Sequence, residues 1–184
     1  MQKTAGLIKK KALELLENGT VTRVLAWSRS EDFIYEVSPT FFTKDNLDDM
    51  IYDSFCAANL SKYLIKACKE QEEGKLLVVL KPCDTYSFNQ LLTEHRFDRE
   101  KVYAVGVGCN GMLDVAKLRS SADGILSVNT EDPDKVAVET LYDGTVTLDR
   151  AELLPDRCVN CKSRKHVAYD ELLGSDGEVL DCHR

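Results

Sequence analysis

Two short apolar segments, each followed by a cysteine, constrain the fold of this chain more than any other feature. They cover residues 76–80 and 102–107, and both are rich in Val or Leu. Continuous apolar runs of this length are typical of strands that are buried on both faces of a parallel sheet. Residues 87–95, between the two runs, have apolar side chains at helical spacing. The stretch therefore predicts a strand–helix–strand unit, whose crossover should be right-handed.

Cys83 and Cys109 each follow one of these strands by two or three residues. Parallel strands joined by a helix end at the same edge of the sheet, and this carboxyl edge is where ligands bind in open α/β sheets. A cysteine there also faces the N-terminus of the next helix, whose partial positive charge favours the thiolate form that binds metals. We therefore expect two thiols to come together at this edge.

Cys158 and Cys161 form a Cys-x-x-Cys motif. This spacing lets two thiolates bind one metal centre from a tight turn. A redox dithiol is the alternative, but that motif normally opens a helix after a strand, whereas this one follows Pro155 and precedes a basic loop. Tetrahedral zinc and cubane clusters usually need four ligands. Cys83 and Cys109 could supply the other two if the C-terminal tail crosses the sheet edge; otherwise each fills a gap near a strand end.

The other three cysteines are interpreted as structural. Cys68 lies on the apolar face of a helix expected from residue 59, and Cys56 precedes that helix. Cys182 stands beside His183 near the C-terminus, where a chain end is often frayed.

Four residues that flank the strand-end cysteines are candidates for cofactor binding: Lys81, Asp84, Asn110 and Gly111. The lysine could be a solvated strand end or a positive group near a reduced cluster. The aspartate and the asparagine could each cap a helix, or could act on the site electrostatically and by hydrogen bonding. The glycine lets the backbone approach a bulky ligand. Basic residues around the Cys-x-x-Cys motif could offset an anionic cluster, dock an acidic carrier or simply be solvated: Arg157, Lys162, Arg164 and Lys165.

Composition narrows the classes of partner. The chain has 184 residues with 24 Lys and Arg against 31 Asp and Glu, a formal charge of -7. This balance argues against nucleic acid or an anionic membrane as the main partner. No apolar run approaches the roughly 18 residues of a membrane span, and the charged amphipathic N-terminus does not resemble a signal peptide. We therefore expect a cytoplasmic location, where seven cysteines indicate metal or redox chemistry rather than disulfides.

The order of expected elements predicts an α/β fold. Its mixed sheet would contain the central parallel strand–helix–strand unit, flanking hairpins and a Cys-rich C-terminal tail folded back on the sheet edge. We assign residues 1–154 to the α/β domain and residues 155–184 to the tail packed on it. The further expected elements are a helix ending at Asn18-Gly19, strands at 21–27 and at 33–37 (closed by Pro39), a helix at 112–118, strands at 125–128 and 135–139, a hairpin at Asp143-Gly144 and a short helix at 169–173.

With KPCD at 81–84, GVGCNG at 106–111 and RCVNC at 157–161, the chain resembles the coenzyme F420 hydrogenase/dehydrogenase beta-subunit family. Members are the iron–sulfur flavoprotein electron-input subunits of hydrogenases and formate dehydrogenases, and relatives occur beside heterodisulfide-reductase-type complexes in anaerobes. The resemblance implies that Cys83, Cys109, Cys158 and Cys161 hold a [4Fe–4S] cluster beside a flavin. The chain departs from the family at Thr4-Ala5-Gly6, where a Gly-Gly turn is usual, and in lacking a ferredoxin-type cysteine run.

The leading hypothesis is an iron–sulfur electron-transfer subunit of a hydrogenase, formate dehydrogenase or heterodisulfide-reductase-like complex, with FAD as a further candidate cofactor. Its partners would be larger redox enzyme subunits or a ferredoxin-like carrier, without nucleic acid or membrane insertion. In the alternative, the same four cysteines hold structural zinc in a docking module without turnover. Thiol–disulfide exchange at Cys158 and Cys161 ranks third. The sequence leaves open whether the chain itself catalyses a flavin-dependent reaction.

Overall fold

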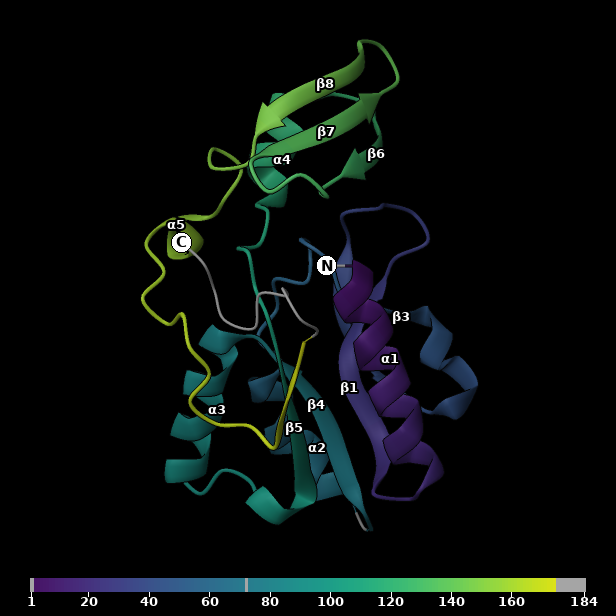
Figure 1. The fold of residues 1–184 in the computed structure, drawn as a ribbon, viewed down its shortest axis with the longest axis vertical. Coiled ribbons are helices and arrows are strands. Elements are labelled where there is room, and N and C mark those ends of the chain that lie inside the picture. Colours follow the sequence, from purple (N-terminus) through teal and green to yellow (C-terminus); the bar gives the residue numbers. More distant parts are fainter. Residues whose placement is uncertain (1, 72, 175–184) are drawn as a thin grey trace.

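The computed structural model describes residues 2–71 and 73–174, and in this part of the chain two sheets are present (Figure 1). The larger is a six-stranded mixed sheet with the strand order β2-β1-β4-β5-β9, in which β3 also pairs with β1. Its strands are β1 (Val21–Arg29), β2 (Val37–Phe42), β3 (Met50–Ile51), β4 (Lys75–Leu80), β5 (Val102–Val107) and β9 (Glu171–Leu173). The α/β fold class is confirmed.

The predicted strand–helix–strand unit is confirmed as β4, α3 (Pro82–Thr93) and β5, with β4 and β5 parallel. The helix begins earlier than predicted, because Pro82 occupies the first turn, where a missing N–H costs nothing. The Asp84 carboxylate also accepts a hydrogen bond from the Lys81 backbone N–H at 3.3 Å, which is the capping role considered for this residue. Cys83 therefore lies inside the first helical turn rather than in the loop before it.

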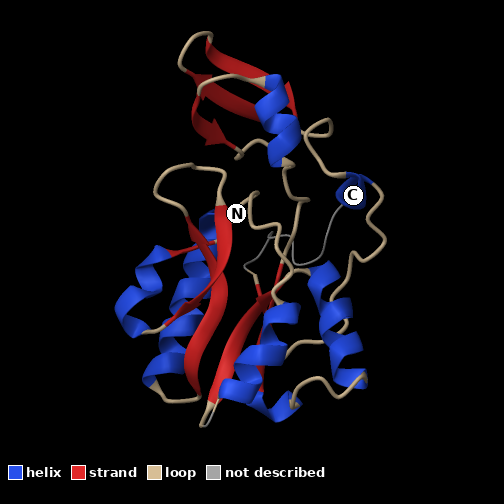
Figure 2. Ribbon diagram, turned by 180° about the vertical axis from the view of Figure 1, so that it is seen from behind, coloured by secondary structure: helices blue, strands red, loops and turns tan. Residues whose placement is uncertain are grey.

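The remaining helices of the larger layer flank the sheet (Figure 2). They are α1 (Gln2–Glu17), α2 (Leu64–Glu70), and the short 3-10 segments η1 (Lys44–Asp49), η2 (Ser61–Tyr63) and η3 (Arg99–Lys101). α1 packs on β1, and α3 packs on β4 and β5. The core between them contains fully buried Trp27, Leu77 and Phe88. Burial of these apolar side chains is the main force that holds the helices on the sheet.

The strand predicted at residues 33–37 is wrong. Residues 33–36 are a connecting loop in which the Phe33 and Tyr35 rings stack, with their centroids 5.5 Å apart, and Val37 is the first residue of β2. The strand that pairs with β1 is β2, which contains Pro39 opposite Trp27 instead of ending before it. β2 lies at the edge of the sheet, where a residue without an N–H donor is tolerated.

A second, three-stranded antiparallel sheet lies beyond the carboxyl ends of β4 and β5 (Figure 1). It comprises β6 (Ile125–Asn129), β7 (Lys135–Thr140) and β8 (Gly144–Asp149), preceded by α4 (Val115–Ser121). The hairpin predicted at Asp143-Gly144 is confirmed, and Gly144 has the positive φ of +66° that such turns require. The helix predicted at 112–118 is α4, which begins only at Val115. The Asp114 side chain caps its first turn by accepting hydrogen bonds from the Ala116 and Lys117 N–H groups.

The Cys-rich tail contains α5 (Asp156–Val159), runs past α3 and returns to the larger sheet as β9 (Figure 1). The tail is therefore folded back on the sheet edge, as predicted, but the helix expected at residues 169–173 is wrong. Residues 171–173 instead form a strand parallel to β5, with Leu172 opposite Gly106. The edge of β5 has backbone N–H and C=O groups that residues 171–173 can pair with only when they are extended. This pairing favours a strand over a helix for these residues.

The expected division at residue 154 stays a prediction. Cys182 and His183 lie outside the described residues. None of the helices in the described ranges combines the length and the apolar character needed to cross a membrane.

Candidate metal centre

One cavity, of about 100 Å³, is lined by all four cysteines that the sequence proposed as ligands. Cys83 comes from the first turn of α3, Cys109 from the loop after β5, Cys158 from α5, and Cys161 from the loop that follows α5. The other lining residues include the apolar side chains of Ala57, Pro82 and Met112. The structure thus brings together two cysteine pairs that lie far apart in the sequence, at the carboxyl edge of the parallel strands.

The tail is held against α3 by one hydroxyl group. Thr85 Oγ1 accepts a hydrogen bond of 3.1 Å from the Val167 backbone N–H and donates one of 2.7 Å to the Pro82 carbonyl oxygen. Thr85 is fully buried and lies two residues after Cys83. This contact therefore fixes the segment after Cys161 next to the helical turn that carries Cys83.

A second attachment of the tail is its close packing against β5. A Cβ at Gly106 would lie 2.4 Å from Leu172 Cδ2 and 2.8 Å from His166 Cδ2, so only glycine lets the tail approach this closely. Asp170 continues the attachment: its carboxylate accepts from the Ala104 N–H at 2.6 Å and from Arg99 Nη2 at 2.8 Å. The path of the tail across the sheet edge is thereby defined on both sides of the cavity.

The loop that carries Cys109 is fixed from the opposite side. Tyr52 donates a hydrogen bond of 2.6 Å to the Gly108 carbonyl, and Arg150 Nη2 contacts the Gly111 carbonyl at 3.3 Å and Ser54 Oγ at 2.8 Å. Gly111 has a φ of +85°, a left-handed conformation that side chains other than glycine rarely adopt. It also lines the cavity, so the backbone there approaches the space between the thiols.

Lys81, which lines the cavity, forms an ion pair with Asp84, and both were proposed to bind a cofactor. The Lys81 ammonium also donates to the Cys56 and Ala58 carbonyls at 2.9 and 3.0 Å. It lies 4.3 Å from the centre of the Trp27 ring, a cation–π contact. Asn110 is half-buried in the loop after Cys109. The cofactor-binding role of all four candidates stays a prediction.

The expected preference for thiolate at the helix N-terminus is not what the surroundings of Cys83 favour. Desolvation, followed by the nearby Asp84 carboxylate, raises the pKa of the Cys83 thiol, whereas Lys81 acts in the opposite direction. The protein therefore favours the neutral thiol, and metal binding would have to displace its proton. Cys56 and Cys68 are buried in the core, as the sequence predicted, and burial raises the pKa of both thiols.

All four candidate donors are thiols, the ligand type that structural zinc and iron–sulfur clusters share. Two thiolates bound to the same zinc ion lie within about 4 Å of each other. Among residues 2–71 and 73–174, no three His, Cys, Asp or Glu side chains are grouped closely enough for a single ion. Four thiols spaced around an apolar cavity suit a cubane cluster, because each thiolate then binds a different iron.

Sequence reasoning missed the residues that position the thiols. These residues are Thr85, Arg150 and Tyr52. Each forms a hydrogen bond at the site with a residue that is between 39 and 96 positions away in the sequence. The single local signal was the glycine within the apolar run at Gly106, because an isolated glycine in a strand marks a close approach of another segment.

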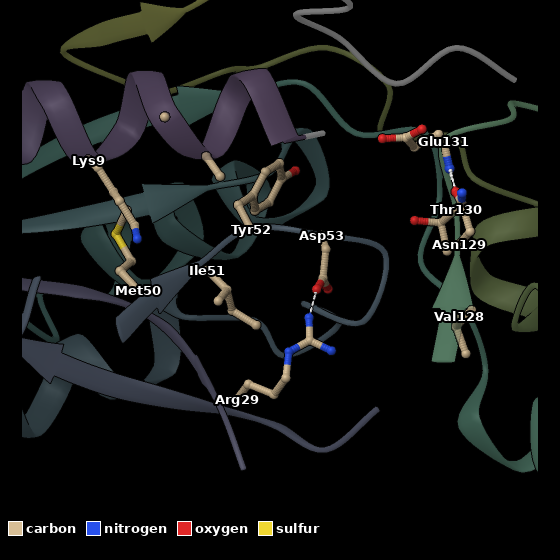
Figure 3. Close-up of a pocket in the computed structure, with 12 residues that line it drawn as sticks. Lys9, Arg29, Met50, Ile51, Tyr52, Asp53, Val128, Asn129, Thr130 and Glu131 are labelled. Atoms are coloured by element: carbon tan, nitrogen blue, oxygen red, sulfur yellow. Dashed lines mark hydrogen bonds and ion pairs between the residues drawn. The ribbon is translucent and has the colours of Figure 1, made fainter. Parts of the chain in front are cut away.

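A second cavity, of about 560 Å³, lies between the two sheets (Figure 3). Lys9 and Gly6 of α1 line one side, and Asn129 at the end of β6 and Glu131 in the loop after it line the other. At its floor the Arg29 guanidinium forms an ion pair with Asp53. Its volume falls within the range of about 300–1,000 Å³ that is usual for cofactor pockets.

The fold and the cavity define an α/β protein with a cysteine-lined centre at the carboxyl edge of its parallel strands. No family model matches the chain. It is 33% identical over 101 residues to the F420-dependent formate dehydrogenase subunit beta of Methanocaldococcus jannaschii, covering 54% of this chain and 26% of that protein. It is 31% identical over 100 residues to the F420-dependent formate dehydrogenase 1 subunit beta of Methanococcus maripaludis, covering 54% of this chain and 25% of the relative.

A solved chain from the F420-reducing [NiFe] hydrogenase complex of Methanosarcina barkeri has the same fold, with a TM-score of 0.63 and 16% identity. The match covers 80% of this chain and 56% of that one. Together these similarities confirm the resemblance to the coenzyme F420 hydrogenase/dehydrogenase beta-subunit family that the motifs indicated. It spans about a quarter of the length of the curated relatives that it matches.

Proposed function

We propose that this chain is an electron-transfer subunit of a multi-subunit oxidoreductase and that Cys83, Cys109, Cys158 and Cys161 hold a [4Fe–4S] cluster. The observation that carries the proposal is the meeting of two distant cysteine pairs around one apolar cavity. The relatives named as formate dehydrogenase beta subunits, and the fold shared with a hydrogenase complex, support a larger redox enzyme as partner. A cytoplasmic location stays a prediction.

The chain's own residues would supply a dry and rigid setting. When bound, a cubane cluster supplies one-electron transfer at a potential set by its surroundings. Cys109 is buried, Cys158 and Cys161 are partly exposed, and Cys83 is exposed. A partner would therefore approach from the side on which Cys83 and the Cys-x-x-Cys motif reach the surface. The buried Arg150 cation, which is bonded to the Gly111 carbonyl beside the cavity, would offset part of the negative charge of a reduced centre, whereas the charge of Lys81 is already paired with Asp84.

The test is metal analysis of protein purified and reconstituted without oxygen. We expect about four iron and four sulfide per chain, with the broad visible absorption and the paramagnetic reduced state of such a cluster. Cys83→Ala and Cys109→Ala should each abolish loading. Cys68→Ala is the matched control and should load normally, because Cys68 lies in the core away from the cavity. Colourless protein without iron would overturn the proposal, and one zinc per chain would favour the docking module.

The proposal extends to a flavin in the cavity between the sheets. Lys9 and the backbone at Gly6 offer a positive charge and open space near the start of α1. Saturable quenching of FAD fluorescence on titration with the protein is the expected result. Lys9→Glu should weaken it, whereas Lys44→Glu, outside the cavity, should not. Quenching that is absent, or that is identical in both variants, would remove the flavin from the proposal.

A further inference from the structure

Four exposed basic residues lie within four positions of Cys158 or Cys161 in the sequence, and we call them the basic rim: Arg157, Lys162, Arg164 and Lys165. Residues 157–165 contain these four and no acidic residue, in a chain whose formal charge is -7. Arg157 also lines the cavity itself. Four positive charges thus lie within residues 157–165, next to the cavity.

This positive charge is not neutralised by ion pairs. Within the described ranges, no carboxylate lies within ion-pair distance of any residue of the basic rim. The neighbouring Asp156 is engaged by Lys117 Nζ at 3.6 Å. Arg164 Nε donates to the Cys161 carbonyl at 3.0 Å, which fixes one guanidinium beside the motif. Within the part of the chain that the structure describes, no ion pair therefore offsets the positive field of the rim.

Large apolar side chains are exposed beside the same rim. Val159 and Val167 belong to the tail and are 50% and 48% exposed, and Tyr86 of α3 is 43% exposed. The Val167 N–H is bonded to Thr85, the residue that precedes Tyr86 in α3. Exposed apolar and tyrosine side chains bordered by arginine and lysine have the composition of a transient protein interface.

We infer that the basic rim docks the acidic face of an electron-transfer protein, so that the partner's redox centre lies over Cys158 and Cys161. This inference rests on the function proposed above and names the chemistry of the partner surface. An extended polyanion fits less well, because the rest of the chain is even more acidic than the whole and would repel a nucleic acid or an anionic membrane. A compact protein with a local acidic patch meets only the rim.

The test uses a purified acidic [2Fe–2S] ferredoxin as the probe and the full chain after anaerobic reconstitution. The variant Lys162→Glu/Lys165→Glu reverses two rim charges that do not line the cavity. The control Lys10→Glu/Lys44→Glu makes the same change in net charge on α1 and η1, at exposed positions away from the rim. We expect the rim variant to weaken binding at least tenfold in calorimetry and the control to stay within about twofold.

The binding should also be sensitive to salt. Raising salt from about 20 mM to about 200 mM should strongly weaken ferredoxin binding by the wild type, because salt screens the attraction between the rim and the acidic partner. The rim variant should respond little, because it already lacks two of the charges that salt would screen. Basic cytochrome c should not bind at the rim.

Iron content measured on the same samples separates the two proposals. Full iron with no salt-sensitive binding of ferredoxin, or with equal loss in rim and control variants, overturns the docking inference and leaves the cluster intact. Absence of iron overturns the proposed function itself. Tighter binding to RNA or to vesicles of anionic phospholipid than to ferredoxin, lost in the rim variant, overturns the inference in favour of a polyanion.

Discussion

The Lys81 ammonium and the Asp84 carboxylate lie 2.9 Å apart, and each side chain is only 2% exposed. The pair joins the end of β4 to the first turn of α3, directly beside Cys83. Two carbonyl oxygens and the Trp27 ring complete the surroundings of the ammonium. A charge this deeply buried is tolerated because each of its partners is in place.

Removal of one member of this pair should strongly destabilise the protein. Lys81→Met leaves the Asp84 carboxylate buried without its partner, which should lower the free energy of unfolding by about 3–5 kcal/mol. Urea unfolding of the metal-free protein measures this change. Lys81→Met/Asp84→Asn removes both charges and should cost less than the sum of the two single variants. A loss below about 1 kcal/mol for Lys81→Met would show that the pair contributes little.

Gly106→Ala should prevent cluster assembly without unfolding the domain. The added Cβ would overlap Leu172 and His166 and push the tail away from β5, so that Cys158 and Cys161 no longer face the other two thiols. Iron per chain after reconstitution is the measurement, with circular dichroism as the check on folding. Gly106→Ala/Leu172→Ala should recover part of the loading because the closest overlap is relieved. Gly6→Ala, where nothing lies within 4 Å, is the control; normal loading of Gly106→Ala would argue against the packing explanation.

Thr85→Val should make a loaded cluster less durable. The substitution keeps the size of the side chain but removes the acceptor for the Val167 N–H, and an unsatisfied buried group costs about 1–3 kcal/mol. Loss of visible absorption in the presence of an iron chelator should therefore be roughly tenfold faster. Thr85→Ser retains the hydroxyl and should behave like the wild type. Equal rates for the valine and serine variants would remove Thr85 from the set of positioning residues.

The stability of the metal-free protein should fall in alkali through Cys68. Burial raises the pKa of the Cys68 thiol from 9.0 to about 11, so the folded state retains a proton that the unfolded chain loses. Its contribution is thus complete below pH 9 and is lost as the pH rises through about 11, at most about 2–3 kcal/mol. Urea unfolding at increasing pH should show a smaller decline for Cys68→Ala. Parallel declines in both proteins would assign the effect to other groups.

The sequence by itself determined the features that depend on neighbouring residues. The apolar runs of β4 and β5, the helix between them, the hairpin at Gly144 and the Cys-x-x-Cys motif were all predicted, because strand burial, helical spacing and turn chemistry act within a few positions. The family resemblance came from the same short motifs.

Only the tertiary structure decided how the tail meets the sheet. Residues 171–173 became a strand because β5 offered an open edge, and Gly106 and Thr85 then held the tail so that Cys158 and Cys161 line the same cavity as Cys83 and Cys109. The burial of Lys81 could not be predicted from the sequence either, because the carbonyl groups that its ammonium binds come from another segment of the chain. Such contacts join residues that are distant in the chain, and their energy exists only once the core has brought those residues together.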